Sequence, residues 1–179
     1  MEQFYASPAG TPGDAARLGR SKYFLRQLGV DVNNAQKVTT LYQDVYPRIG
    51  AAVDGAKQVV KRLAGRFQLG VISNGLPDWQ YKKLQTLGLR EYFGIIVLSE
   101  EVGIRKPDPR IFHKAAALSQ REPGQCLHVG DSYHTDVIGA KKAGMKACWF
   151  NQREEAIPEG SPSPEYEISM LVELLPIVE

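Results

Sequence analysis

The sequence predicts an α/β fold in which a parallel β-sheet is covered by helices on both faces. Short apolar runs alternate with segments of helical periodicity from about residue 50 onward. The runs are continuously apolar, as in strands that are buried on both faces. Turn and capping residues separate them from the helical segments. Strands are expected at residues 67–73, 95–98, 126–129 and 146–150, with a short fifth strand at 166–169.

Each helix expected between these strands has a start or stop signal. Apolar residues recur at helical spacing over 53–63 and end before Gly65. A helix over 77–87 is closed by Gly88 at its C-cap position. Asp108 and Pro109 form an N-cap and N1 pair that opens the next helix. The remaining expected segments are a helix over 136–143 that stops at Gly144 and a last helical turn over 170–175.

The first 50 residues differ in character from the rest of the chain. They begin with a Gly- and Pro-rich stretch and contain no strand pattern. Their apolar residues form two helical patches, one around Phe24 and one around Leu41. We therefore expect residues 1–46 to form a helical accessory and residues 47–179 to form the α/β core, with the boundary near Tyr46–Pro47.

Composition excludes several classes of protein. The net charge is only +2 and the basic residues are spread along the chain, so no nucleic-acid partner is expected. No signal peptide and no apolar stretch of about 20 residues is present, so we expect a cytoplasmic protein without a membrane partner. Cys126 and Cys148 lie in apolar runs and are expected to be buried, reduced thiols. Composition does not predict the oligomeric state.

Three segments should meet at one edge of the sheet. Ligands of such sheets bind outside the carboxyl ends of the strands. Ser73-Asn74-Gly75 ends one strand, and Gly130-Asp131 ends another. The Ser73 hydroxyl and the Asn74 backbone N–H could donate hydrogen bonds to an anionic oxygen. A simple turn remains the plainer interpretation of this dipeptide taken alone.

Lys106 lies in the Pro-flanked segment Arg105-Lys106-Pro107-Asp108-Pro109. The prolines limit the freedom of this loop and would aim the ammonium group at a fixed point as a charge clamp. The alternative interpretation is a surface lysine in a stiff loop. Taken alone, the segment leaves both interpretations open.

Asp131 and Asp136 are the candidate metal ligands. Asp131 follows a strand and a glycine directly, and Mg²⁺ binds one or two carboxylates together with waters and phosphate. Asp136 either ligates the metal through water or orients its direct ligands, or else it is the N-cap of the helix that follows. Both interpretations of Asp136 stay open. His113, His128 and His134 share no metal-ligand spacing, although His134 lies in the same loop.

The order and spacing of these segments resemble motifs two, three and four of the haloacid dehalogenase-like (HAD-like) hydrolase superfamily. The resemblance covers residues 46–150 and depends on Val71-Ile72-Ser73-Asn74-Gly75, Lys106-Pro107-Asp108-Pro109 and Val129-Gly130-Asp131 with Asp136. It implies a three-layer, Rossmann-like parallel sheet. Residues 1–50 look like the tail of the helical cap that many members carry.

In that family, phosphoryl transfer passes through an aspartate, and the resemblance implies the following roles. Ser73 and Asn74 bind phosphoryl oxygen. Lys106 stabilises the nucleophile and the phosphate charge. Asp131 ligates Mg²⁺ with Asp136 in support, so Lys106 and Asp131 are the candidate catalytic residues. These roles make sense because catalysis of this kind consists mainly of positioning and charge stabilisation. The expected partner is a small phosphorylated metabolite.

Motif one of the family, the Asp-x-Asp that supplies the nucleophile, has no match in the sequence. Asp14, Asp31, Asp44 and Asp54 follow no apolar strand and have no aspartate two residues on. The family's first strand lies between the strands that end at Ser73 and Gly130. Its absence leaves backbone groups unpaired, at about 1–3 kcal/mol each.

Three explanations of the missing motif compete. We favour an N-terminally truncated, inactive form of an ordinary hydrolase. The second explanation is a non-catalytic phosphate-binding or interaction relative. The third, a strand supplied by residues 1–10 or by another chain, is the least favoured, because Met1 to Ser7 is short and poorly patterned.

Dehalogenation is the alternative reaction within the superfamily. Ser73-Asn74 would suit either reaction, but the dehalogenases carry a Ser-Asn-rich fourth motif. Gly130-Asp131, with a second aspartate five residues on, instead favours a Mg²⁺-dependent phosphatase.

Overall fold

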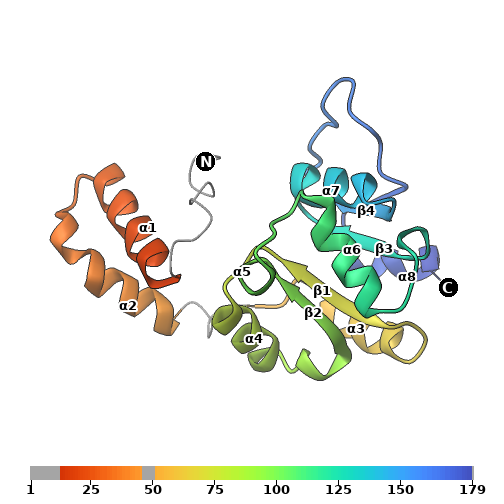
Figure 1. Cartoon of the computed structure of the whole chain (residues 1–179), viewed down its shortest axis with the longest axis horizontal. Coiled ribbons are helices and arrows are strands. Elements are labelled where there is room, and N and C mark those ends of the chain that lie inside the picture. The colour runs from red at the N-terminus through yellow and green to blue at the C-terminus, as the bar shows by residue number, and fades with distance from the viewer. Residues whose placement is uncertain (1–12, 46–50, 179) are drawn as a thin grey trace. The chain divides into compact units, whose positions relative to one another are not determined.

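The computed structural model describes residues 13–45 and 51–178 (Figure 1). The chain divides into two compact units, Met1–Gly50 and Ala51–Glu179. The boundary expected at Tyr46–Pro47 lies outside the described residues. No helix in the described ranges is long and apolar enough to cross a membrane.

The N-terminal unit is a helical pair. It consists of α1 (Gly13–Gln27), the 3₁₀ turn η2 (Val32–Asn34) and α2 (Ala35–Val45). The Asp31 carboxylate caps η2 by accepting a hydrogen bond from the Asn33 N–H at 2.9 Å. Phe24 is 56% and Leu41 63% exposed, so part of the two apolar helical patches is not covered within this unit.

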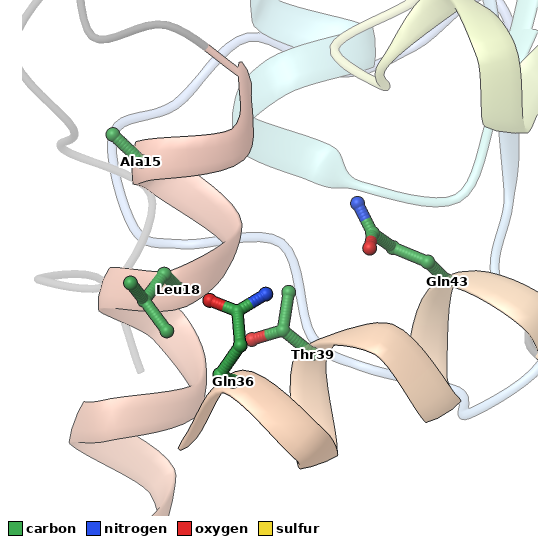
Figure 2. Close-up of a pocket in the computed structure, with 5 residues that line it drawn as sticks. All are labelled: Ala15, Leu18, Gln36, Thr39 and Gln43. Atoms are coloured by element: carbon green, nitrogen blue, oxygen red, sulfur yellow. The ribbon is translucent and has the colours of Figure 1, made fainter. Parts of the chain in front are cut away.

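A small polar pocket lies between α1 and α2 (Figure 2). The Thr39 hydroxyl lies 2.7 Å from the Ser21 hydroxyl and 2.7 Å from the Ala35 carbonyl oxygen. The contact with Ser21 joins the two helices beside the pocket. The pocket is lined by Ala15, Leu18, Gln36, Thr39 and Gln43.

The second unit confirms the α/β fold and its parallel strands. β1 (Leu69–Ser73) pairs with β2 (Phe93–Leu98) in one sheet. β3 (Leu127–Gly130), β4 (Lys146–Phe150) and β5 (Tyr166–Ile168) form a second sheet in that order. The strands therefore form two parallel sheets rather than one continuous sheet. Among the described residues, no strand is hydrogen-bonded to both β1 and β3.

Helices follow the strands in sequence, mostly as expected. Asp108 caps α6 by accepting a hydrogen bond from the Arg110 N–H at 3.0 Å, and Pro109 is its first residue. Gly88 and Gly144 have positive φ and follow the ends of α4 and α7. The helices are α3 (Ala56–Ala64), α4 (Pro77–Thr86), α5 (Ser99–Val102), α6 (Pro109–Leu118), α7 (Ile138–Lys142) and α8 (Leu174–Val178), with a π-helix η5 (Tyr133–Val137) and 3₁₀ turns η3 (Arg90–Tyr92), η4 (Pro123–Gln125) and η6 (Leu171–Glu173).

Two apolar clusters lie on opposite faces of the strands. Ala147 and Trp149 of β4 belong to the cluster with α6 and α7, and Cys148 and Phe150 belong to the cluster with α3 and α8. Because alternate residues of a strand point to opposite faces, helices cover both faces. This is the three-layer arrangement expected from the continuously apolar strands.

Candidate functional site at the carboxyl ends of β1 and β3

Asn74 joins the end of β1 to the loop that carries Lys106. Its side-chain Nδ2 donates to the Lys106 carbonyl oxygen at 3.0 Å, and its Oδ1 accepts from the Lys106 N–H at 2.8 Å. The Ser73 hydroxyl oxygen accepts from the Gly75 N–H at 3.1 Å. The peptide bond between Lys106 and Pro107 is cis. The two reciprocal hydrogen bonds fix the backbone of Lys106 relative to β1.

The Lys106 side chain reaches from this loop toward the end of β3. Its Nζ lies 2.5 Å from Oδ1 of Asp136, and the two side chains are only 12% and 5% exposed. This ion pair connects the segments that follow β1 and β3. Asn74, Lys106 and Asp136 therefore form a continuous polar chain across the carboxyl edge of the core.

Asp136 is the most constrained carboxylate of the site. The His128 Nε2 lies 3.0 Å from its Oδ1, and the Ser132 N–H donates to its Oδ2 at 3.1 Å. Burial by itself raises the pKa of Asp136, but the contact with His128 and the charge of Lys106 outweigh it and lower the pKa to about 2. Asp136 is therefore ionised at neutral pH.

Gly130 allows Asp136 to lie directly over the end of β3. A Cβ atom at residue 130 would overlap the Asp136 side chain, so the close approach requires glycine. The following helix is capped by Ser132, whose hydroxyl accepts from the Thr135 N–H at 3.3 Å. The N-cap interpretation of Asp136 is therefore wrong, because the helix begins one turn earlier than expected, as the π-helix η5.

Asp131 follows Gly130 and is exposed. Its backbone carbonyl accepts a hydrogen bond from the Trp149 Nε1–H at 3.1 Å, which anchors the loop to β4. The side chain lines the cavity between β1 and β3, as do Lys106 and Asp136. The structure thus brings Ser73, Asn74, Lys106, Asp131 and Asp136 to one edge of the core.

Of the two candidate metal ligands, Asp131 and Asp136, only Asp131 has a carboxylate suited to a hard cation. The exposed Asp131 carboxylate has the chemistry that Mg²⁺ prefers. Asp136 is already engaged through both oxygens with Lys106, His128 and Ser132. No group of three His, Cys, Asp or Glu residues suited to a metal occurs in the described parts of the chain. The assignment of Asp131 and Asp136 to a metal, and of Lys106 to catalysis, therefore stays a prediction.

His128 is the residue of this site that sequence reasoning missed. It lies on β3, where Val129 points to one face, and His128 and Gly130 point to the other. The alternation would have placed His128 on the same face as Gly130, the residue that Asp136 covers. Its ring also packs edge-on against Phe112, with ring centroids 5.0 Å apart. His134, in contrast, is exposed.

No other aspartate with a described side chain lines the cavity beside Asp131 and Asp136. Asp31 and Asp108 cap η2 and α6, and Asp78 lies in the first turn of α4. Among the described residues, the cavity edge thus carries the Lys106–Asp136 ion pair and the Asp131 carboxylate.

The architecture defines an α/β protein whose candidate ligand site lies at the carboxyl ends of parallel strands. A sequence profile of the haloacid dehalogenase-like hydrolases matches residues 3–144. The chain therefore belongs to the haloacid dehalogenase-like hydrolase family.

Several curated relatives are enzymes that act on phosphate esters according to their names. The pyrimidine 5'-nucleotidase YjjG of Escherichia coli is 32% identical over 87% of this chain and 68% of its own length. The glyceraldehyde 3-phosphate phosphatase of Pyrococcus furiosus is 31% identical over 88% of this chain and 68% of its own. The chain thus spans about two thirds of each of these relatives.

Solved structures show the same fold. The putative HAD-hydrolase YfnB of Bacillus subtilis, solved with magnesium, matches 99% of this chain and 78% of its own with a TM-score of 0.85 and 27% identity. A 2-haloacid dehalogenase of Pseudomonas syringae matches 92% of this chain and 70% of its own with a TM-score of 0.71 and 30% identity. By their titles, one of these neighbours is a putative hydrolase bound to magnesium and the other is a haloacid dehalogenase.

Proposed function

We propose that the α/β core is the phosphate-binding part of a Mg²⁺-dependent phosphate monoester hydrolase that uses an aspartyl-phosphate mechanism. One observation carries the proposal. Asn74 holds the Lys106 backbone with two hydrogen bonds, and the Lys106 ammonium pairs with the buried Asp136. A fixed cation, the Ser73 hydroxyl and the Asp131 carboxylate are thereby gathered at the sheet edge where ligands of such folds bind.

In this proposal Ser73 and the Asn74 N–H donate hydrogen bonds to phosphoryl oxygens. The Lys106 ammonium balances the charge of the phosphoryl group and of the attacking carboxylate. Asp136 holds Lys106 in place and is itself held by His128. Asp131 would hold Mg²⁺, which when bound neutralises phosphate charge.

We further propose that the chain by itself does not turn over substrate. The sequence contains no Asp-x-Asp, and the described residues place no aspartate opposite Ser73 and Asp131. The substrate class is a small phosphorylated metabolite, which the names of the nucleotidase and the phosphatase relatives support. A cytoplasmic location, without nucleic-acid or membrane partners, remains part of this proposal.

The test is hydrolysis of p-nitrophenyl phosphate with and without Mg²⁺. It compares the chain alone with a version extended at its N-terminus by an apolar strand that ends in Asp-x-Asp-Gly-Thr. We expect no turnover by the chain alone and Mg²⁺-dependent turnover by the extended version, abolished by Asp131→Asn. Turnover by the chain alone that depends on Asp131 would contradict the inactive state. Absence of turnover by both the chain alone and the extended version would contradict the proposed phosphatase activity.

Dehalogenation is the second candidate reaction. Ser73-Asn74 suits it, and the Pseudomonas syringae dehalogenase is 30% identical to this chain. Chloride release from 2-chloropropionate by the extended version, without Mg²⁺ and without phosphatase activity, would favour this reaction. Binding of phosphate without either reaction would instead favour a non-catalytic phosphate-binding module.

A further inference from the structure

Gly139, near the start of α7, lies where two other segments approach this helix closely. It is buried, and a Cβ atom at this residue would lie 2.6 Å from Cε2 of Phe112 and 3.1 Å from Cα of Pro107. Non-bonded carbon atoms pack best at about 3.5–4.0 Å, so an added methyl group would push both neighbours away. The missing side chain therefore allows Phe112 and Pro107 to lie against α7.

The local conformation of Gly139 does not by itself require glycine. Its φ is not positive, and it lies within the helix α7. Glycine weakens a helix relative to alanine, because it loses more backbone freedom on folding. The close approach of the two neighbouring segments is therefore the physical reason for a glycine at this position.

The contact with Pro107 concerns the candidate catalytic lysine, because Pro107 directly follows Lys106. The Lys106 backbone is also held by Asn74, through hydrogen bonds of 3.0 and 2.8 Å. The loop is thus attached to two elements. Hydrogen bonds join it to the end of β1, and a close packing contact joins it to α7.

The segment that contains Gly139 also carries the ionic partner of Lys106. Asp136 lies three residues before Gly139 in η5, which continues directly into α7. The Lys106 Nζ lies 2.5 Å from Oδ1 of Asp136. One helical segment therefore contacts both the ammonium group of Lys106 and the backbone beside it. The distance between the loop and α7 determines how closely the ammonium group can approach Asp136.

Phe112 connects the same close contact to His128. Phe112 is fully buried, and its ring packs edge-on against His128, with ring centroids 5.0 Å apart. The His128 Nε2 in turn lies 3.0 Å from Oδ1 of Asp136. Because packed interiors transmit strain, a displacement at Gly139 would reach Asp136 through Phe112 as well as through the lysine loop.

We propose that Gly139 is a positioning residue for Lys106 in the phosphoryl transfer proposed above. By admitting Pro107 and Phe112 against α7, it keeps the Lys106 ammonium group against Asp136. A cation stabilises developing phosphoryl charge only if it is held in place beforehand, so a small displacement should lower kcat more than it changes KM. The catalytic consequence rests on the proposed function, whereas the position of Lys106 does not.

The position of Lys106 can be measured in the full chain without substrate. Acetic anhydride acylates exposed lysines faster than buried, ion-paired ones, and mass spectrometry gives the rate at Lys106 relative to the exposed Lys61. We expect Gly139→Ala to raise this relative rate at least about threefold. Gly124→Ala is the matched control, because an added Cβ there would meet no atom of another segment closer than 3.9 Å. An unchanged rate in Gly139→Ala would overturn the proposal.

The same samples distinguish a local displacement from a general loosening of the core. Cys148 is 1% exposed and belongs to the apolar cluster with α3 and α8, on the opposite face of β4 from α7. Its reaction with iodoacetamide should be as slow in Gly139→Ala as in the wild type. Faster modification of Cys148 together with faster acylation of Lys106 would show that the whole core opens, and the proposal would be wrong.

Phe112→Leu provides a second background for the measurement, because leucine lacks the ring atoms that an alanine at residue 139 would overlap. In this background Gly139→Ala should accelerate Lys106 acylation less than in the wild type. Some acceleration should remain, since the close contact with Pro107 remains. Equal acceleration in both backgrounds would contradict the steric mechanism. If Gly139→Ala alone does not fold, the double variant is compared with Phe112→Leu, and an unchanged rate overturns the proposal.

Hydrolysis of p-nitrophenyl phosphate by the extended version tests the catalytic consequence. We expect Gly139→Ala to lower kcat at least about tenfold and to change KM less than about twofold. An equal loss in Gly124→Ala, or a higher KM with unchanged kcat, would contradict the role of Gly139 in catalysis. Absence of turnover by the unsubstituted extended version would contradict the proposed function, and the acylation rates would still decide the position of Lys106.

Discussion

The Lys106 ammonium lies 2.5 Å from Oδ1 of the buried Asp136, and this contact joins the segments that follow β1 and β3. The two segments are far apart in the sequence. Among the described residues, β1 and β3 are not hydrogen-bonded to each other. The ion pair is therefore a principal polar link across the carboxyl edge of the core. The stability of the core should depend on it.

Replacement of Lys106 by Met should destabilise the core by about 3 kcal/mol, because it leaves the Asp136 charge buried without its ammonium partner. Urea unfolding at pH 7 measures this change. Arg105→Met is the control, since Arg105 pairs with Glu100 at the surface, where both side chains are 36% exposed. That pair should contribute less than about 1 kcal/mol. Equal losses in both variants would contradict the special role of Lys106.

The core should become less stable as the pH falls, because Asp136 becomes protonated. Its folded-state pKa is lowered from 3.8 to about 2, so its contribution is present above the unfolded-state pKa and is lost as the pH falls toward 2. The loss should be about 2 kcal/mol. Urea unfolding of the wild type and Asp136→Asn between pH 2 and 6 tests it. The difference between the two proteins should be largest near pH 6 and should narrow toward pH 2.

Asn74 can be tested through a graded series of substitutions. Asn74→Ala removes both hydrogen bonds to the Lys106 backbone and should cost about 2 kcal/mol. Asn74→Asp retains the acceptor for the Lys106 N–H but loses the donor to its carbonyl, and should cost less. Thermal or urea unfolding provides the ranking. Equal stability of the alanine variant and the wild type would show that the loop is held by other contacts.

His128 should act by holding Asp136 in position. His128→Ala removes the contact to Oδ1 and part of the packing on Phe112, and should cost about 2–3 kcal/mol. His128→Gln can donate a hydrogen bond and should recover part of this loss. A structural role in packing alone would give the opposite order, with His128→Phe more stable than His128→Gln. Urea unfolding at pH 7 separates the two outcomes.

The two cysteines should react at different rates. Cys148 is buried, and burial raises the pKa of its thiol to about 11, whereas Cys126 is half-buried. Iodoacetamide at pH 8 should therefore modify Cys126 first under native conditions. Modification of Cys148 should require unfolding. Mass spectrometry of the two peptides over time measures both rates, and equal rates would contradict the burial of Cys148.

Much of the core was predictable because the turn and capping residues agree with the apolar patterns of the strands and helices. β4 has the expected bounds, and the other strands differ by one or two residues at their ends. Asp108 and Pro109 begin α6 as expected, since capping depends on local side-chain geometry. The start of η5 was not predictable, because the Ser132 cap and a π-helical turn replace the expected start at Asp136.

The sequence by itself determined the α/β class, the parallel strands and the gathering of Ser73, Lys106 and Asp131 at one edge, because strand ends and helix caps depend on nearby residues. Only the tertiary structure decided that Lys106 pairs with Asp136 and that His128 supports this pair, since these contacts join residues 30 and 8 positions apart. It also showed that β1 and β3 line one apolar cavity. The sequence predicted a gap between the strands that end at Ser73 and Gly130 only through the family resemblance, because no local pattern specifies a relationship between two distant strand edges.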